Sequence, residues 1–455
     1  MKTPILTILM LFSVFGIKSQ IQLLRYNDDF TSLRSDSIHK KGFDKLKHIK
    51  LSKRSNISFG GEIREQYQYY QNPNFGDLPP GYEQVSSGQV WQRAMLHTNL
   101  ELGTKARVFA QTGSTFRFLN PNPLTPEIDE NQLSLHQAFI DLRLSKKWAT
   151  RIGRQEISYG NHSLITFREG PNTRLAFDAV VFKRNTDKEK LDFFIMTPVI
   201  SKPGVFDDES FKDLVIGMYK TEIFVPGKFM LDYYSMSLNS KRRQYDYTAG
   251  EEYRQTYGIR LYSENQRFNY ELEANYQYGK FNQLKISAYN ISADMNYKLH
   301  DKSGFVVGLS GNYTSGDKNN EDAELNTYNS FFSKPQYGLT APISAVNIIN
   351  ANPYVRIRPG SKLDIYAGAN FMWRQSNQDG IYSPGAIQVR PDHSDIFDSK
   401  EKQLGTLMTL EALYSVNKHL SFALDLGYFV AGKYVKETGN GKNIFYSSFK
   451  INYKF

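Results

Sequence analysis

Apolar and polar residues alternate along most of the chain after residue 55. Such alternation predicts β-strands with one apolar and one polar face, because successive side chains of a strand point to opposite sides. The clearest case spans residues 268–278, and the pattern recurs in residues 363–373, 420–430 and 445–455. In the first of these segments the apolar set is Phe268, Tyr270, Leu272, Ala274, Tyr276 and Tyr278. We therefore expect an all-β protein.

The length of the strands and the rhythm of their connections favour a membrane barrel over a soluble sandwich. Ten residues at about 3.3 Å each, tilted near 45°, cover roughly 23 Å, which matches the apolar band of outer-membrane barrels. Short turns are expected at residues 103–104, 145–147, 225–227, 264–266, 359–360 and 417–418. Longer loops are expected at residues 71–90, 119–132, 201–212, 239–251, 316–349 and 375–400. This asymmetry predicts a transmembrane antiparallel β-barrel of about 18 strands, with its short turns in the periplasm.

The first segment of the chain predicts secretion. Lys2 is followed by an apolar run, up to Ile17, that is too short to span a bilayer as a helix. We therefore interpret residues 1–19 as a cleavable signal peptide. Residues 20–55 are polar and charged and are expected to form a periplasmic extension, which leaves residues 56–455 for the barrel. The predicted location is the outer membrane of a Gram-negative bacterium.

Composition agrees with this class of protein. The 455 residues include no cysteine, which removes disulfides and thiolate chemistry, and 14% of them are aromatic. The last predicted strand ends the chain at Phe455, and a terminal phenylalanine on such a strand resembles the signal that outer-membrane proteins present to their insertion machinery. The expected partners are that machinery and the lipid of the outer membrane.

If the apolar residues face lipid, the opposite phase faces the lumen, and arginines gather there. An arginine at the bilayer midplane would cost about 2–4 kcal/mol, so an inward position is favoured. The arginines expected to line the pore are Arg64, Arg93, Arg107, Arg143, Arg154, Arg174, Arg254, Arg260, Arg356, Arg358 and Arg374. Rings of arginine select anions in channels. Any single one is better explained by a salt-bridge ladder without a role in selectivity, but the set predicts an anion-attracting lumen.

Two predicted strands that flank a Gly/Pro/Asn-bearing loop carry an unusual density of charge. On the second, Arg174 and Asp178 share one face and are expected to line the pore. The opposite face of that strand is formed by Leu175, Phe177, Ala179 and Val181. On the first, Arg154 and Glu156 share a face with the apolar Ile152, so a bulge or a position at the rim is required there.

Three blocks of this region resemble a known family. They read HQAFIDLR at residues 136–143, GRQEISYG at residues 153–160 and RLAFDAV at residues 174–180. Their order and spacing are similar to those of the alginate-export porin family. The resemblance implies a monomeric outer-membrane barrel of eighteen strands. One departure from the family pattern is Ser163, followed by Leu164, where an Arg-Leu pair often stands.

The resemblance also implies a function. The family has an arginine-rich, electropositive constriction through which a polyuronate leaves the periplasm. By matching position, Arg143, Arg154 and Arg174 would belong to that lining, with Glu156 and Asp178 as their partners.

We therefore expect a passive channel that conducts or exports an anionic polysaccharide of the alginate type. An alternative is an anion-preferring porin for the uptake of small acids or phosphate. A third reading is a barrel-embedded hydrolase, which needs a Ser/His or Asp/His pair at the outer rim, and no convincing pair stands in the sequence. The arginines are spread over many strands, so nucleic acid is not an expected ligand. We expect no enzymatic activity, no catalytic residues, no metal and no cofactor.

Overall fold

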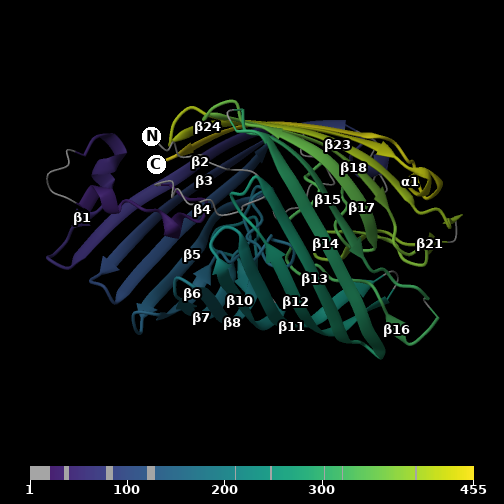
Figure 1. Ribbon diagram of the computed structural model, residues 1–455, viewed down its shortest axis with the longest axis horizontal. Helices are drawn as coiled ribbons and strands as arrows, with labels where there is room; N and C mark the ends of the chain where they lie inside the picture. The colour runs from purple at the N-terminus through teal and green to yellow at the C-terminus, as the bar shows by residue number, and fades with distance from the viewer. Residues whose placement is uncertain are drawn as a thin grey trace.

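The chain forms a closed antiparallel β-barrel (Figure 1). The computed structural model describes residues 21–34, 40–77, 86–119, 129–210, 212–245, 248–301, 303–319, 321–394 and 397–455. The predicted signal peptide lies outside these residues. Within them, eighteen strands form the wall: β2 (Ser55–Gln71), β3 (Ser86–Leu102), β4 (Ala106–Phe118), β5 (Asn131–Arg143), β6 (Trp148–Gln155), β7 (Phe177–Asn185), β8 (Glu189–Ile200), β10 (Leu214–Val225), β11 (Phe229–Tyr245), β12 (Thr248–Tyr262), β13 (Phe268–Phe281), β14 (Leu284–His300), β15 (Phe305–Thr314), β17 (Ile348–Ile357), β18 (Leu363–Trp373), β23 (Gln403–Ser415), β24 (Leu420–Ala431) and β25 (Ile444–Lys454).

Each strand pairs with its neighbours in sequence, and β2 pairs with both β3 and β25 to close the sheet. The predicted all-β fold and strand number are therefore confirmed. The shorter elements are η1 (Arg25–Asn27), η2 (Thr31–Arg34), η3 (Gly42–Leu46), β1 (Ile49–Lys50), η4 (Pro73–Gly76), β9 (Glu209–Ser210), β16 (Glu324–Leu325), β19 (Ile381–Ser383), β20 (Ile387–Arg390), β21 (His393–Ser394), β22 (Phe397–Asp398) and α1 (Lys433–Glu437). No helix in the described part of the chain is long and apolar enough to cross a bilayer.

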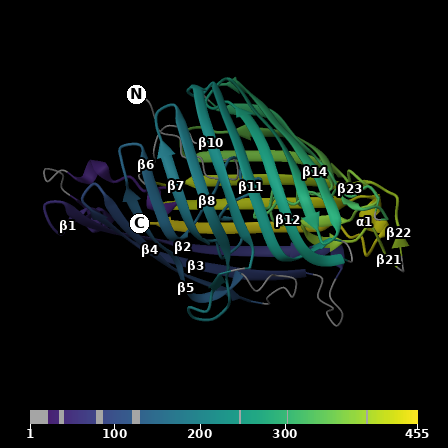
Figure 2. The same cartoon turned by 90° about the horizontal axis from the view of Figure 1, so that it is seen from below.

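The short turns lie at the barrel end that also carries the C-terminus and the N-terminal elements (Figures 1 and 2). All six predicted short turns fall between strands, and two further connections, β7 to β8 and β14 to β15, complete this end. The predicted loop at residues 239–251 is wrong. There β11 continues to Tyr245 and β12 begins at Thr248, so these two strands form a long hairpin.

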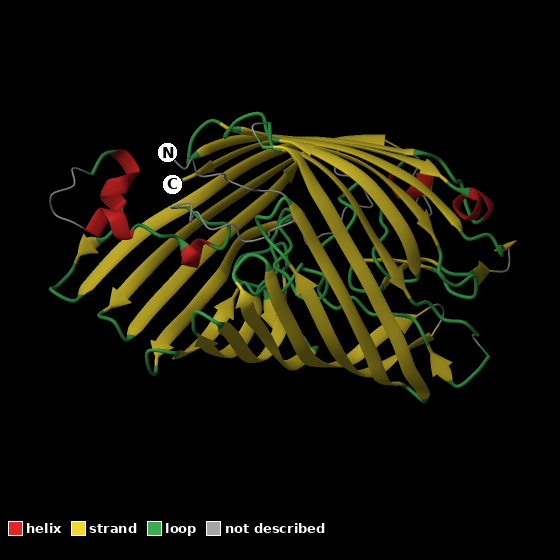
Figure 3. Cartoon of the chain, viewed as in Figure 1, coloured by secondary structure: helices red, strands yellow, loops and turns green. Residues whose placement is uncertain are grey.

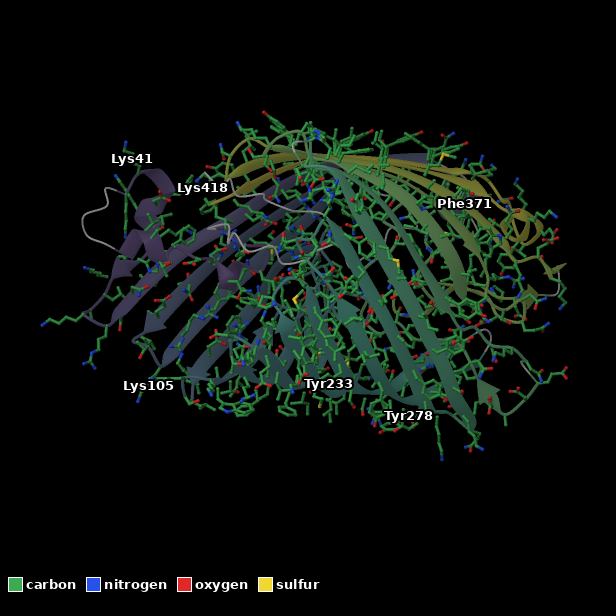
Figure 4. All side chains as sticks on the ribbon, viewed as in Figure 1. Lys41, Lys105, Tyr233, Tyr278, Phe371 and Lys418 are labelled. Carbon is green, nitrogen blue, oxygen red and sulfur yellow. The ribbon has the colours of Figure 1, made fainter. Side chains whose placement is uncertain are left out.

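The face that the alternation assigned to lipid is confirmed. Phe268, Tyr276 and Tyr278 of β13 are exposed on the outside, whereas Glu273 and Gln277 between them are buried. In the same way Phe371 is exposed on β18, and Figure 4 labels it and Tyr278 on the wall of the barrel. Because lipid admits few polar groups on the outside of a barrel, period-two patterning of this kind identifies the outer face.

Loops fold into the inside of the barrel (Figure 3). The connection between β6 and β7, residues 156–176, folds into the lumen, and we call it the inner loop. It meets the connection that precedes β17, since Thr166 donates a backbone hydrogen bond to the carbonyl of Phe332 at 3.2 Å. Their apolar side chains, with inward residues of β7 to β14, form a buried core.

Candidate functional site

The inner loop brings charged side chains against the wall of β2 and β3. Arg93 of β3 places its Nη2 2.6 Å from Glu62 Oε1 and 2.6 Å from Glu169 Oε1 of the loop. Arg174, also from the loop, pairs with Glu169 and lies 3.7 Å from Glu62 Oε2. Arg64 Nη1 is 3.7 Å from Glu169 Oε1. We call Glu62, Arg64, Arg93, Glu169 and Arg174 the arginine–carboxylate cluster.

The loop is fastened to the wall at Asn172, next to this cluster. The Asn172 amide donates to the backbone carbonyls of Gln92 and Phe116, at 3.2 and 3.1 Å, while its side-chain oxygen accepts a hydrogen bond from Arg64 at 3.1 Å. Its backbone N–H donates to Asp129 at 2.7 Å. Arg64 also donates to the carbonyl of Glu169 at 3.2 Å. The polar groups of Asn172 are thus used to hold the loop in place.

The cluster is covered, at the barrel end with the short turns, by residues 21–34, which we call the N-terminal segment. These residues were expected to form a periplasmic extension, and they lie in the mouth of the barrel. Tyr26 donates its hydroxyl to the carbonyl of Glu156 at 2.9 Å and packs edge-on against Phe139. Arg174 donates to the carbonyl of Leu23 at 3.5 Å. The segment and the inner loop therefore meet inside the lumen.

Charge in the cluster is closely balanced. The side chains of Glu62 and Arg93 are each 1% exposed and that of Arg174 is fully buried. Glu156 Oε1 adds a third carboxylate, 3.5 Å from Arg174 Nη1, and accepts a hydrogen bond from His136 at 2.8 Å. Burial alone would raise the pKa of Glu169, but the guanidinium groups of Arg174 and Arg93 lower that pKa to about 2. Glu169 is therefore ionised at neutral pH.

The other predicted arginines of the lumen wall are held in ion pairs. Arg107 pairs with Asp141, which also binds Arg151 at 2.6 Å. Further along the wall the pairs are Arg254 with Glu252 at 2.8 Å, Arg260 with Asp232 at 2.7 Å and with Glu271 at 2.8 Å, Arg356 with Asp364 at 2.5 Å, and Arg358 with Asp364 at 2.9 Å. Most of the predicted lining arginines thus take part in salt bridges. This was the expectation for any single one of these arginines.

Two predicted lining residues lie at the ends of the barrel. Arg143 is the last residue of β5 and is exposed at the end with the short turns. Arg374 follows β18 at the opposite end, where it is fully buried and donates to backbone carbonyls of the loop before β23, including that of Ser399 at 2.9 Å. Neither side chain faces the cluster.

The predicted orientation of Arg154 and Asp178 is wrong. Arg154 pairs with Asp178 at 2.8 Å, and these two residues are also directly opposed in the register of β6 and β7. They share the phase of Ile152 and Val180, which are 47% and 42% exposed on the outer surface. The inward phase of β7 is apolar because Phe177, Ala179 and Val181 pack in the core under the loops. Arg174 and Asp178 therefore do not share a face.

Several residues of the site were missed by the sequence reasoning. Glu169 was not among the predicted lining residues, although it contacts three arginines. Arg151, which pairs with Asp141, was also absent from the predicted lining residues. Its guanidinium lies 4.2 Å from the ring centre of Tyr26 and 4.1 Å from that of Phe139. The signal for Glu169 was its position in a charged loop between two of the family blocks.

Two cavities lie inside the barrel, and the smaller one adjoins the cluster. One, of about 100 Å³, is lined by Arg64, Glu169 and Lys334. The other, of about 190 Å³, lies against the wall from β13 to β23 and also includes Lys334. The two cavities thus share Lys334 in their linings.

Comparison with known proteins explains this arrangement. The sequence matches the alginate-export family over residues 55–445, which is most of the chain. The chain belongs to the alginate-export family. The resemblance found in three short blocks is therefore confirmed by a match that covers all of the barrel except most of its last strand. No curated protein sequence matches the chain.

Solved structures of porins share the fold of this family member. The outer membrane protein opdK from Pseudomonas aeruginosa is 9% identical, with a TM-score of 0.61, over 88% of this chain and 98% of that chain. OpdO from the same organism is 12% identical, with a TM-score of 0.59, over 88% and 97%. A BenF-like porin from Pseudomonas fluorescens Pf-5 is 10% identical, with a TM-score of 0.59, over 88% and 98%. The protein is an outer-membrane channel.

Proposed function

We propose that this channel exports an anionic saccharide of the uronate class, and that the arginine–carboxylate cluster is its recognition site. The observation that carries the proposal is the position of Glu169, whose carboxylate contacts Arg64, Arg93 and Arg174 within the lumen. A uronate unit carries the same functional group. Glu169 therefore occupies the place that a substrate carboxylate would take.

Exchange of one carboxylate for another explains how such a site releases its cargo. Leaving a buried guanidinium without a partner costs about 3–5 kcal/mol, so the inner loop is not expected to open freely. When a substrate carboxylate replaces Glu169, Arg64 and Arg93 stay paired and this cost is avoided. Successive carboxylates of one chain would repeat the exchange, because sites that bind weakly and in series allow passage.

A second candidate function is an anion-preferring porin for small acids. It is favoured by the size of the two cavities, about 190 and 100 Å³, which suit single small solutes better than a polymer. The two functions differ in how binding affinity should depend on the length of the ligand. A polymer channel should bind a uronate oligomer much more tightly than the monomer, whereas a small-acid porin should not.

The substitution Glu169→Gln tests the proposed function. Glutamine preserves the size of the side chain and removes its charge, so Arg64 loses its ion pair with Glu169 and Arg93 keeps only its pair with Glu62. We expect a uronate hexamer to block the ionic current through the variant at a concentration at least about tenfold lower than the concentration that blocks the wild type. The reason is that a hydrogen-bonded charge partner contributes roughly 1.5–3 kcal/mol. The measurement is the concentration of oligomer that halves the current in planar bilayers.

The matched control is Glu321→Gln, which removes an exposed carboxylate from another loop. This variant should be blocked like the wild type. If Glu169→Gln and Glu321→Gln respond alike to the uronate hexamer, the cluster does not recognise carboxylates and the proposed function is wrong. Equal block by uronate monomer and hexamer would instead favour the small-acid porin.

The anion preference of the channel is expected to fall between pH 7 and pH 9. Burial lowers the pKa of Lys334 to about 8, although Glu271 opposes the shift. Lys334 is mostly charged below this value and mostly neutral above it, so the lumen loses a positive charge as the pH rises. The measurement is the reversal potential in a salt gradient. Lys334→Gln should remove the dependence of anion preference on pH. The control Lys318→Gln, at an exposed position in the same loop, should retain it. A wild-type reversal potential that does not change between pH 7 and pH 9 would contradict the expectation.

A further inference from the structure

The larger cavity differs in chemistry from the cluster. Its wall is formed by inward residues of β13, β14, β15, β17, β18 and β23, and we call it the chamber. Its volume is about 190 Å³. Because a water molecule needs about 10–15 Å³ of such space, the chamber has room for on the order of ten waters, which is comparable with one sugar ring. It is therefore large enough to hold a ligand and not only a few structural waters.

Amides and tyrosines dominate the chamber wall. The Asn350 amide donates to Asn370 Oδ1 at 2.9 Å, and Asn352 donates to the Tyr366 hydroxyl at 2.9 Å. The rings of Tyr354 and Tyr366 lie next to each other, with centroids 5.4 Å apart. Amides supply both donors and acceptors, and aromatic rings offer an apolar face with a polar tip. This combination suits a ring that has hydroxyl groups at its edge and C–H groups on its face.

Two carboxylates of the chamber lack the ion pairs that the other lumen carboxylates have. Within the described residues, no lysine, arginine or histidine lies within 4.0 Å of Asp294 or Glu411. Asp294 instead accepts a hydrogen bond from the Tyr354 hydroxyl at 2.9 Å. In contrast, Glu271 and Asp364 in the same wall pair with arginines at 2.8 and 2.5 Å. The carboxyl oxygens of Asp294 and Glu411 can accept hydrogen bonds, so both side chains are suited to hydroxyl donors.

We infer that the chamber is a binding site for an uncharged, hydroxyl-rich saccharide unit, with Asp294 and Glu411 accepting hydrogen bonds from its hydroxyl groups and Tyr354 and Tyr366 contacting its ring. The site adjoins the cluster through Lys334, which lines both cavities. This inference rests on the proposed function, because it states that the exported saccharide contains uncharged units as well as units with carboxylates. A chain with both kinds of unit would place its acidic units at the cluster and its neutral units in the chamber.

The test is the binding of maltohexaose, an uncharged glucose oligomer, to the full chain in detergent, measured by calorimetry. Wild-type protein should bind it. The double variant Asp294→Asn/Glu411→Gln should bind it about tenfold more weakly, because each carboxylate acceptor is replaced by a weaker amide acceptor of the same shape. Binding of a uronate hexamer should change less than twofold, since the cluster is unaltered. The matched control is Asp187→Asn/Asp301→Asn, which removes two exposed carboxylates at the short turns.

Three results would overturn the inference. The first is no binding of maltohexaose to the wild type, and the second is equal binding by the wild type and the chamber variant. The third is much tighter binding of an amino-sugar hexamer than of maltohexaose, which would make the chamber a site for cations. Each is independent of the response of Glu169→Gln to uronate, so the chamber and the proposed function can fail separately.

Discussion

Replacing Arg25 and Tyr26 by alanine in the full chain is expected to raise the ionic current through the barrel several-fold. Both side chains hold the N-terminal segment in the mouth of the lumen. Arg25 donates to the carbonyl of Gly61 at 2.6 Å and to that of Phe455 at 2.9 Å, where the first and last strands meet. Tyr26 donates its hydroxyl to the carbonyl of Glu156 at 2.9 Å, and its ring packs edge-on against Phe109 and Phe139.

The energies involved are large enough to release the segment. Truncating a large buried aromatic side chain costs about 3–5 kcal/mol, and each hydrogen bond from a charged group contributes roughly 1.5–3 kcal/mol. The wall would lose only contacts with the segment, because Phe109 and Phe139 also stack on each other at 5.2 Å. The barrel should therefore stay folded while its mouth opens.

Single-channel recording in planar bilayers measures this effect. The control is Thr31→Ala/Ser32→Ala, which changes two exposed side chains of the same segment. It should leave the current unchanged. An unchanged current in the Arg25/Tyr26 variant, together with protease cleavage of the segment in that variant only, would show that the released segment does not limit conduction.

The outer face of the barrel could be predicted from the sequence, but its inner face only in part. Lipid imposes one rule on every strand, so Phe268 and Phe371 could be assigned from local alternation alone. No such rule applies inside, where each residue faces whatever loop folds over it. Phe177 was placed in lipid because it is apolar, yet it is buried against Phe332 of a loop that is distant in sequence. Alternation cannot reveal phase when both faces of a strand are apolar.

The ion pairs of the lumen were predictable as a class, but their partners were not. Cross-strand pairs such as Arg356 with Asp364 follow from neighbouring strands of one hairpin. The arginine–carboxylate cluster does not, because Glu169 and Arg174 reach it on the inner loop while Glu62 and Arg93 reach it from the wall. Three-dimensional folding of the loop decides these contacts. The sequence could therefore indicate the charged lumen and the family, but not the contacts that form the arginine–carboxylate cluster.

Arg374→Ala is expected to loosen the loop between β18 and β23 without changing anion selectivity. The Arg374 side chain is fully buried and donates to the carbonyls of Asp379, Ser399 and Glu401 at 3.0, 2.9 and 2.6 Å. Its guanidinium also lies 3.8 Å from the ring centre of Tyr434 in α1. One side chain thus joins both ends of the loop to the neighbouring connection. Loss of these charged hydrogen bonds should destabilise the closed loop by several kcal/mol, at roughly 1.5–3 kcal/mol each.

Limited proteolysis of the folded barrel measures this change, with cleavage expected within residues 374–402 at much lower protease concentration than in the wild type. The matched control is Arg358→Ala, which removes an arginine whose side chain is 20% exposed and pairs with Asp364. A partly exposed pair contributes only about 1 kcal/mol or less, so this variant should resist cleavage like the wild type. If Arg374→Ala instead alters the reversal potential in a salt gradient and leaves the loop resistant, Arg374 acts on permeating ions. Its hydrogen bonds to the backbone carbonyls of three loop residues argue for the structural role.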